Sequence, residues 1–262
     1  MDDNRNPLRR RVFLLLRIML PVWAVLLGAF ALPRFELDGR VATVAYWLSA
    51  SGGRLGLPVM VFLILPVVIG RPGLTGNRRR RETRTIVGIL LLILGATAFI
   101  NERITKPAFA HPRPNIVELA EIGVLDMPAK DFYETQTKHE RRQYLSSVLT
   151  KDFQHFPMSD RVRVEWAYET GFSFPSGHAF ASMLFATFCV AMGMNYTTGP
   201  RRLVLYSLAG WAILVCYSRP VMRVHTPTDI NCGGLLGVFM GTIAFVAVHR
   251  FLCKPEEEPP AV

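Results

Sequence analysis

Residues 179–194 read AFASMLFATFCVAMGM, a stretch without a single charged side chain. An apolar run of roughly 17–25 residues is long enough to cross a bilayer as a helix, and a polar neighbour such as Asn195 can extend a shorter run. Five more apolar runs lie on either side of it, at residues 12–32, 55–70, 85–100, 203–217 and 230–248. The pattern predicts an all-α fold, a six-helix transmembrane bundle.

The overall composition agrees with a membrane protein. Half of the 262 residues are hydrophobic and only 19% are charged, while the mean hydropathy is no higher than +0.26 because polar segments separate the runs. The net charge of +10 lies mostly in arginines at the ends of the runs. Such arginines set topology and contact anionic lipid head groups. We therefore expect membrane lipid as a partner, and no nucleic acid.

The positions of the basic residues predict the orientation. The N-terminus, the connection that carries Arg78–Arg81 and the connection that carries Arg201 and Arg202 fall on one side of a six-helix arrangement, which is then cytoplasmic. The long connection at about 101–175 faces outward. We expect one integral-membrane domain over residues 1–254, with an extramembrane, helical cap at about 101–175 inserted between helices 3 and 4. An acidic, proline-rich tail covers residues 255–262.

Two of the expected helices depart from the usual pattern of a membrane span. The run at 55–70 contains Pro58 and Pro66, which membrane helices tolerate when neighbours satisfy the freed carbonyls. The first run follows Arg9–Arg11 and ends in Ala29-Phe30-Ala31, as a signal peptide with a small-residue cleavage site would. It is longer than a typical signal core and is interrupted by Arg17. We predict an uncleaved first helix, with a signal peptide as the alternative.

The long outer connection has its own pattern. Residues 130–148 alternate as an amphipathic helix does, whereas the apolar residues of 161–168 suit either a helix or a strand. The connection forms either a packed cover or a lid that selects substrates. All four cysteines lie within the apolar runs or at the end of one, which predicts packing roles and no structural disulfide.

The first candidate motif is KPAFAHPRP at residues 106–114, just past the third run. Lys106 offers a point charge and Arg113 a planar fork, and both suit an anion. The prolines restrict the backbone between the two cations. The alternative is that the two side chains reach along the membrane to its aqueous interface.

The second motif is FPSGH at residues 174–178, which opens the fourth run. Ser176 suits the N-cap of a helix, which places the amides of Gly177 and His178 at the positive end. Such an end is a ready phosphate site, and glycine permits close approach of the backbone. The alternative is a capped helix without a ligand.

The third motif is SRPVMRVHTPTD at residues 218–229, between the last two runs. Pro227 fits a first helical turn with Thr226 as N-cap. His225 and Asp229 are four residues apart and can face each other there. A carboxylate on one imidazole nitrogen leaves the other free to attack an electrophile. Because all three motifs emerge on the same predicted side, they indicate one anion-handling catalytic site rather than separate helix caps.

The three motifs resemble the signatures of the type 2 phosphatidic acid phosphatase family, which is related to the vanadium haloperoxidases. They match as Lys-x6-Arg-Pro, Pro-Ser-Gly-His and Ser-Arg-x5-His-x3-Asp. With RPNIV at 113–117, DFYET at 131–135 and ETGFSFPSGH at 169–178, the chain is similar to the bacterial phosphatidylglycerophosphatase branch from its third helix to its end. The resemblance implies a multi-pass hydrolase of the bacterial inner membrane with its site on the periplasmic face. Its expected substrates are lipid phosphates or diphosphates, namely phosphatidylglycerophosphate, undecaprenyl diphosphate, phosphatidic acid and diacylglycerol diphosphate.

The resemblance also implies the roles of individual residues. His225 is the expected nucleophile that forms a phosphohistidine, Asp229 orients it, and His178 is the general acid. The expected phosphate-binding groups are Lys106, Arg113, Ser176, Gly177 and Arg219. No metal or other cofactor is expected, because the cations take its place. Of the neighbouring residues, Glu169 could contact head groups and His111 could line the site.

Three other functions use the same features. A lipid phosphotransferase would pass the phosphate to a second lipid, and a haloperoxidase-type oxidoreductase would hold vanadate in the anion pocket. Six spans with an interfacial site argue against the oxidoreductase. A transporter would carry intramembrane charges, yet the runs hold almost none beyond Arg17.

Overall fold

The computed structural model describes residues 7–70, 76–134, 137–150 and 155–252. Within these ranges every regular element is a helix, and the only extended pairing is an isolated bridge between Leu37 and Met158. Five helices are long and apolar enough to cross a membrane, and a bent pair of helices brings the number to six when it counts as one span. The all-α fold class is therefore confirmed.

The five long spans cover predicted runs and extend beyond them, because polar residues at the ends continue the helices. The first span joins α1 to a 3-10 segment, and the span after the bent pair continues through a π-helical turn. Their bounds are α1 Pro7–Ala24 with η2 Val25–Ala31, α4 Gly76–Ile100 with η3 Asn101–Thr105 and α5 Lys106–Phe109, α10 Gly177–Tyr196, α11 Gly199–Val221 and α12 Pro227–Leu252.

The second predicted span is different from the single helix expected at 55–70. It is a pair, α2 (Arg40–Gly52) and α3 (Gly56–Ile69), bent by 64°. The sequence pattern missed α2 because polar residues such as Thr43 and Ser49 dilute its apolar character. The bend falls at the consecutive glycines Gly52 and Gly53 and not at a proline, since Pro66 lies inside α3.

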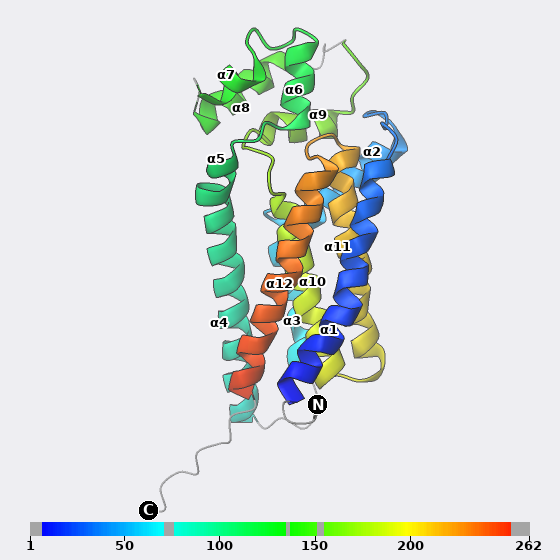
Figure 1. Ribbon diagram of the computed structural model, residues 1–262, viewed down its shortest axis with the longest axis vertical. Coiled ribbons are helices and arrows are strands. Elements are labelled where there is room, and N and C mark those ends of the chain that lie inside the picture. Colours follow the sequence, from blue (N-terminus) through cyan, green and yellow to red (C-terminus); the bar gives the residue numbers. More distant parts are fainter. Residues whose placement is uncertain (1–6, 71–75, 135–136, 151–154, 253–262) are drawn as a thin grey trace, which may run out of the picture.

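Helix α10 forms the centre of the bundle, and most of its residues are buried. Figure 1 shows α1, α11 and α12 around it, with α4 at one side. Cys189 and Cys216 are free thiols in this core and act as apolar packing groups, and Cys232 is free and half-buried. Cys253 lies outside the described residues.

Helices α10 and α12 approach each other through a glycine stripe, which we define as Gly233, Gly237 and Gly241. A Cβ atom added at any of the three would lie 2.5 Å from a carbonyl oxygen of α10. Those oxygens belong, in the same order, to Ser176, Phe180 and Leu184. Small residues at four-residue spacing allow two helix backbones to touch in a membrane. The contact draws the start of α12, with the third motif, against the start of α10, with the second.

The cap contains α6 (Pro114–Glu121), α7 (Ala129–Glu134), α8 (Lys138–Val148) and α9 (Asp160–Tyr168). It lies at the end of the bundle opposite the start of α1 and the end of α12 (Figure 1). The single helix predicted at 130–148 is wrong: α7 and α8 are separate, and Thr137 starts α8 through a capping box with Glu140. Residues 135–136 lie outside the described ranges. Residues 161–168, left open between helix and strand, are helical in α9.

The cap has a small core of its own that also contacts the third motif. Phe132, Leu145 and Trp166 are fully buried in it. The indole Nε1 of Trp166 donates to the carbonyl oxygen of Met222 at 2.8 Å, in the loop between α11 and α12. The cap is thus packed onto the end of the bundle that carries the third motif.

Candidate active site

The third motif forms a tight loop that ends in a helix cap. Arg223 has a left-handed φ of 57°, and the amide of Val224 donates to the carbonyl of Arg219 at 3.1 Å. At the start of α12, Thr226 N donates to Asp229 Oδ2 at 2.8 Å and Asp229 N donates to Thr226 Oγ1 at 3.1 Å. This reciprocal cap fixes the carboxylate. His225 Nδ1 lies 3.3 Å from the same Oδ2 atom, so the predicted pairing of His225 with Asp229 is confirmed.

The other nitrogen of His225 faces Arg113. Arg113 Nη1 lies 3.0 Å from His225 Nε2, and the guanidinium also donates from Nη1 to Val224 O and from Nε to Gly171 O. A guanidinium has donors only, so Nε2 accepts and the imidazole proton is on Nδ1, toward Asp229. Burial, with the charges of Arg113 and Arg219, lowers the pKa of His225 well below its usual value. His225 is therefore neutral, with its lone pair on Nε2.

The second motif begins α10, as predicted. Ser176 is the N-cap, and its Oγ accepts from Ala179 N at 3.5 Å. The amide of Ser176 donates to the carbonyl oxygen of Asp229 at 3.0 Å, so the second and third motifs are joined through the main chain. Gly177 and His178 follow in the first turn, where the helix dipole is positive. A Cβ atom added at Gly53, in the α2–α3 bend, would lie 3.1 Å from His178 Nε2.

Glu169 joins the two motif arginines. Its carboxylate lies 2.6 Å from Arg113 Nη2 and 3.0 Å from Arg219 Nη2. Arg219 is fully buried, and its Nη1 atom contacts Glu165 at 2.8 Å and Ser49 Oγ. Burial opposes the ionised form of Glu169, but Arg113 and Arg219 outweigh it and lower the pKa of this carboxyl. The two motif arginines are thus held in place by carboxylates.

Lys106, the first cation of the predicted site, is also buried. Its Nζ atom lies 2.9 Å from Glu102 Oε2, one helical turn earlier. The other oxygen of Glu102 pairs with Lys138, at the start of α8 in the cap. A single carboxylate therefore connects the membrane helix to the cap beside the site.

These groups enclose a cavity of about 760 Å³. One part of its wall is charged, with Lys106 and Arg113 near His178 and His225. Another part is apolar and comes from the spans, with Leu57, Pro58, Leu94, Ala98 and Phe180. A pocket of this size with convergent polar groups and an apolar side suits a ligand that has an anionic head and a hydrocarbon tail.

The predicted site residues come together, although not all of them reach the cavity. Lys106, Arg113, Gly177, His178 and His225 line it. Ser176, Arg219 and Asp229 are fully buried and do not line it: Ser176 caps α10, Asp229 contacts His225, and Arg219 contacts Glu169. His111 is not among the lining residues; its Nδ1 lies 3.0 Å from Ser173 Oγ.

Sequence reasoning missed several lining or supporting residues. Glu165 had a usable signal, because it is four residues before Glu169 and shares its helix face. Glu102 had the same kind of signal, because it is four residues before Lys106. Ser49, Gly53 and Lys138 had none, since they come from segments distant in the chain.

One group of side chains at the site has the composition of a metal-binding cluster. Glu165, Glu169 and His178 each present a ligand atom, and these atoms lie within 4.8 Å of one another. Both carboxylates already pair with arginines. The positive charge of those arginines disfavours a metal ion at the same place.

The arrangement of the motifs agrees with a comparison of the chain with known protein families. The model of the PAP2 superfamily matches residues 86–253, which is more than half of the chain. The chain belongs to the PAP2 superfamily. The family resemblance predicted from the three motifs is thereby confirmed.

Curated relatives of this PAP2 chain include phosphatidylglycerophosphatase B of Escherichia coli (strain K12), 28% identical over 176 residues that cover 65% of each chain. The protein of the same name from Haemophilus influenzae is 29% identical over 154 residues, 55% of this chain and 58% of the relative. Lipid A 4'-phosphatase of Bacteroides thetaiotaomicron is 27% identical over 90 residues, 34% of this chain and 37% of the relative. The match covers 65% of the Escherichia coli relative and smaller shares of the other two, so it spans less than two thirds of the length of each.

Proposed function

We propose that this PAP2 chain is a membrane lipid phosphatase that acts on lipid phosphates and diphosphates through a phosphohistidine intermediate. The observation that carries the proposal is the state of His225, which is neutral and held between Asp229 and Arg113 in the wall of a cavity that is cationic at one part and apolar at another. The family membership and the names of the relatives support it. The candidate substrates are phosphatidylglycerophosphate, undecaprenyl diphosphate, phosphatidic acid and diacylglycerol diphosphate.

In the proposed first step, His225 Nε2 attacks the phosphorus atom and the bond from phosphorus to the lipid oxygen breaks. His178 donates a proton to that oxygen, so a neutral alcohol or a lipid phosphate leaves. Asp229 stabilises the positive charge that the imidazole acquires. In the second step, water gives a proton to His178 and attacks the phosphohistidine, which releases phosphate and restores His225.

Charge that builds on the phosphate oxygens needs fixed positive groups around it. Lys106, Arg113 and the amide of Gly177 line the cavity, and the N-terminus of α10, capped by Ser176, adds its dipole. Arg219 does not line the cavity; it contributes positive charge from its position next to Glu169, with which it pairs. Binding of phosphate draws Arg113 away from His225 Nε2, so the nucleophile is released when its target arrives.

The proposed location is the bacterial inner membrane, with the site on the outer, periplasmic face. The arginines at the start of α4 and of α11 support this orientation, because they lie at the end of the bundle opposite the cap and basic residues favour the cytoplasmic side. The catalytic end then faces outward, where lipid head groups of that leaflet can enter the cavity.

The test is phosphate release from a panel of these lipids by the purified protein in detergent, together with acid-quench or base-quench trapping of radiolabelled enzyme. We expect free phosphate and a protein label that is stable in base and labile in acid, as a phosphohistidine is. His225→Ala should give neither. Label that passes to a second lipid without free phosphate would identify a phosphotransferase. Loss of activity in EDTA that magnesium restores would identify a metal-assisted reaction instead.

A further inference from the structure

The catalytic cavity carries more positive charge than its carboxylates balance. Five basic and three acidic side chains line it. The basic ones are Arg54, Lys106, Arg113, Lys138 and Arg142, and the acidic ones are Glu102, Glu165 and Glu169. The carboxylates pair with Lys106, Arg113, Lys138 and the buried Arg219. Within the described part of the chain, no carboxylate pairs with Arg54 or Arg142.

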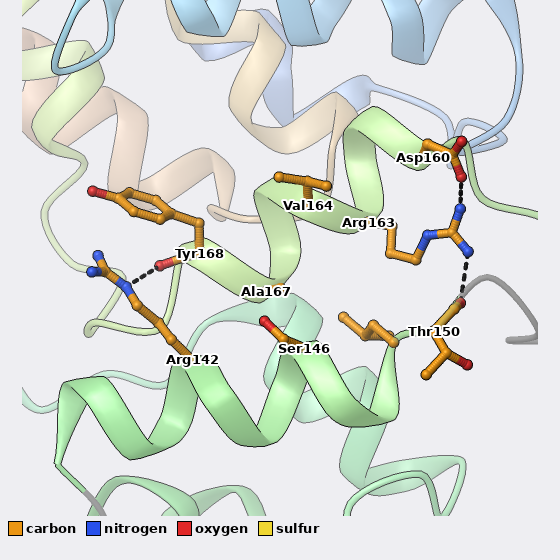
Figure 2. Close-up of a pocket in the computed structure, with 9 residues that line it drawn as sticks. Arg142, Ser146, Thr150, Asp160, Arg163, Val164, Ala167 and Tyr168 are labelled. Carbon is orange, nitrogen blue, oxygen red and sulfur yellow. Dashed lines mark hydrogen bonds and ion pairs between the residues drawn. The ribbon is translucent and has the colours of Figure 1, made fainter.

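Two of the cations come from the cap. Lys138 and Arg142 are four residues apart on α8 and therefore share one helix face. Arg142 Nε donates to the carbonyl oxygen of Tyr168 at 3.0 Å, a contact that Figure 2 shows beside a second, smaller cavity of about 480 Å³ between α8 and α9. The contact joins α8 to the main chain of the residue directly before Glu169.

The third cation comes from the bundle. Arg54 follows the bend between α2 and α3, and its guanidinium carbon lies 5.5 Å from the centre of the Tyr168 ring. The guanidinium carbon of Arg142 lies 3.8 Å from the same centre. The ring of Tyr168 thus lies next to two guanidinium groups at the cavity, one from the α2–α3 connection and one from the cap.

These cations adjoin the proposed phosphate site without belonging to it. Lys138 shares the carboxylate of Glu102 with Lys106. A Cβ atom added at Gly171 would lie 3.7 Å from Lys138 Nζ, and the carbonyl of Gly171 accepts from Arg113 Nε at 2.8 Å. Lys138 is therefore the neighbour of both Lys106 and Arg113, whereas Arg142 and Arg54 are grouped around Tyr168.

We propose that Arg54, Lys138 and Arg142 form a second anion subsite that binds a phosphate group of the substrate other than the one transferred to His225. The proposal rests on the lipid phosphatase function proposed above. The group that is not transferred is a phosphodiester in phosphatidylglycerophosphate and the inner phosphate in a lipid diphosphate; either one carries a single negative charge, and arginine forks bind phosphate oxygens with direction. The subsite gives the enzyme a preference for lipids with two phosphate groups over lipids with one. In a lipid diphosphate the second group is adjacent to the first, and in phosphatidylglycerophosphate a glycerol separates them.

The test compares kcat/KM on phosphatidic acid, diacylglycerol diphosphate and phosphatidylglycerophosphate with the same acyl chains. The variants are Arg54→Gln, Lys138→Gln and Arg142→Gln, and the matched control is Lys130→Gln, an exposed cation of the same cap. We expect about a tenfold loss per variant on the lipids with two phosphates, because a charge-assisted hydrogen bond contributes on that scale. Phosphatidic acid should change by less than about threefold on the same reasoning. Arg142→Lys, which keeps the charge, should retain most of the preference.

The pattern of losses decides between the possibilities. A loss confined to the diphosphate or to phosphatidylglycerophosphate supports the subsite and identifies which second phosphate it takes. Equal losses on all three lipids would mean general attraction of anions, and unchanged activity would mean no contact; either overturns the subsite while the phosphatase function stands. If the wild-type protein releases no phosphate from any lipid, the proposed function itself fails. Thermal unfolding of each variant separates a lost contact from a damaged fold.

Discussion

Arg113 Nη1 lies 3.0 Å from His225 Nε2, so a cation holds the lone pair of the proposed nucleophile. In the proposed mechanism the same guanidinium binds the phosphate, and it cannot serve both partners fully. Arrival of the phosphate and release of the lone pair are then one event.

The two histidines of the site should respond differently to substitution. His225→Ala removes the nucleophile, so turnover should vanish with every substrate. His178→Ala removes only the general acid, which is typically worth about 10²–10⁴-fold. Its effect should be large on phosphatidic acid, where an alkoxide leaves, and smaller on an aryl phosphate or a diphosphate. The measurement is kcat/KM for both variants on each substrate. Residual activity of His225→Ala that depends on the leaving group would reverse the two roles.

Glu169→Gln should weaken the fold and strengthen anion binding. Removing the carboxylate leaves the buried Arg113 and Arg219 facing a neutral amide, and breaking a buried pair costs on the order of 3 kcal/mol. In the variant no Glu169 carboxylate competes with vanadate for these arginines, so vanadate should bind more tightly. Vanadate should therefore raise the unfolding temperature of the variant more than that of the wild type. Thermal unfolding in detergent measures both effects. Glu134→Gln, on an exposed ion pair of α7, is the control. A smaller vanadate shift in Glu169→Gln would contradict the bridging role.

The pH dependence should report the cations around His225. Burial and the cations, Lys106 among them, lower its pKa well below the ordinary 6.5, so it is neutral above that depressed value and becomes protonated only as the pH falls through it. Lys106→Met removes a positive charge and should raise this pKa, which moves the acidic limb of kcat/KM to higher pH. Both proteins are assayed on the same aryl phosphate, whose leaving group depends little on protonation by His178. Because the substrate is the same, its ionisation affects the wild type and Lys106→Met equally. Lys130→Met should leave the limb in place. A limb that moves to lower pH in Lys106→Met would refute this account.

The glycine stripe can be tested on stability. A Cβ atom at Gly237 would lie 2.5 Å from Phe180 O and 2.8 Å from Met183 Cβ, so Gly237→Ala must push α12 from α10. Overpacking of this kind costs about 1–3 kcal/mol, and the unfolding temperature and the activity should fall together. Gly95→Ala on α4, which meets no atom within 4 Å, is the matched control and should be neutral or slightly stabilising. Equal unfolding temperatures of the two variants would mean that the close contact is not needed.

The proposed orientation predicts which positions an impermeant thiol reagent reaches. In a variant without native cysteines, Thr137→Cys at the start of α8 should be labelled in intact spheroplasts, and Asn77→Cys at the start of α4 should not. Both should be labelled after the membrane is opened. Labelling of Asn77→Cys alone in intact spheroplasts would place the site on the cytoplasmic side.

The sequence predicted the parts of this molecule that depend on local pattern. Apolar runs marked the five long spans, and the spacing of His225 and Asp229 predicted their contact because both belong to one helix start. The run at 55–70 marked α3, but α2 escaped notice because it mixes polar and apolar residues, and so did the bend at two glycines that joins the pair. The carboxylates also escaped: the pairing of Glu169 with Arg113 and Arg219 depends on three segments that meet only in the folded chain. Periodicity carries no information about such long-range ion pairs.

The glycine stripe and the bond from Ser176 N to Asp229 O join the start of α10 to the start of α12 through main-chain atoms. No side chain of α8 takes part in that contact. In the proposed mechanism, the distance between the two segments that carry His178 and His225 therefore does not depend on the cations of α8. We therefore expect a chimaera that carries the α8 of another PAP2 protein to keep its turnover and to change its preference among lipid substrates.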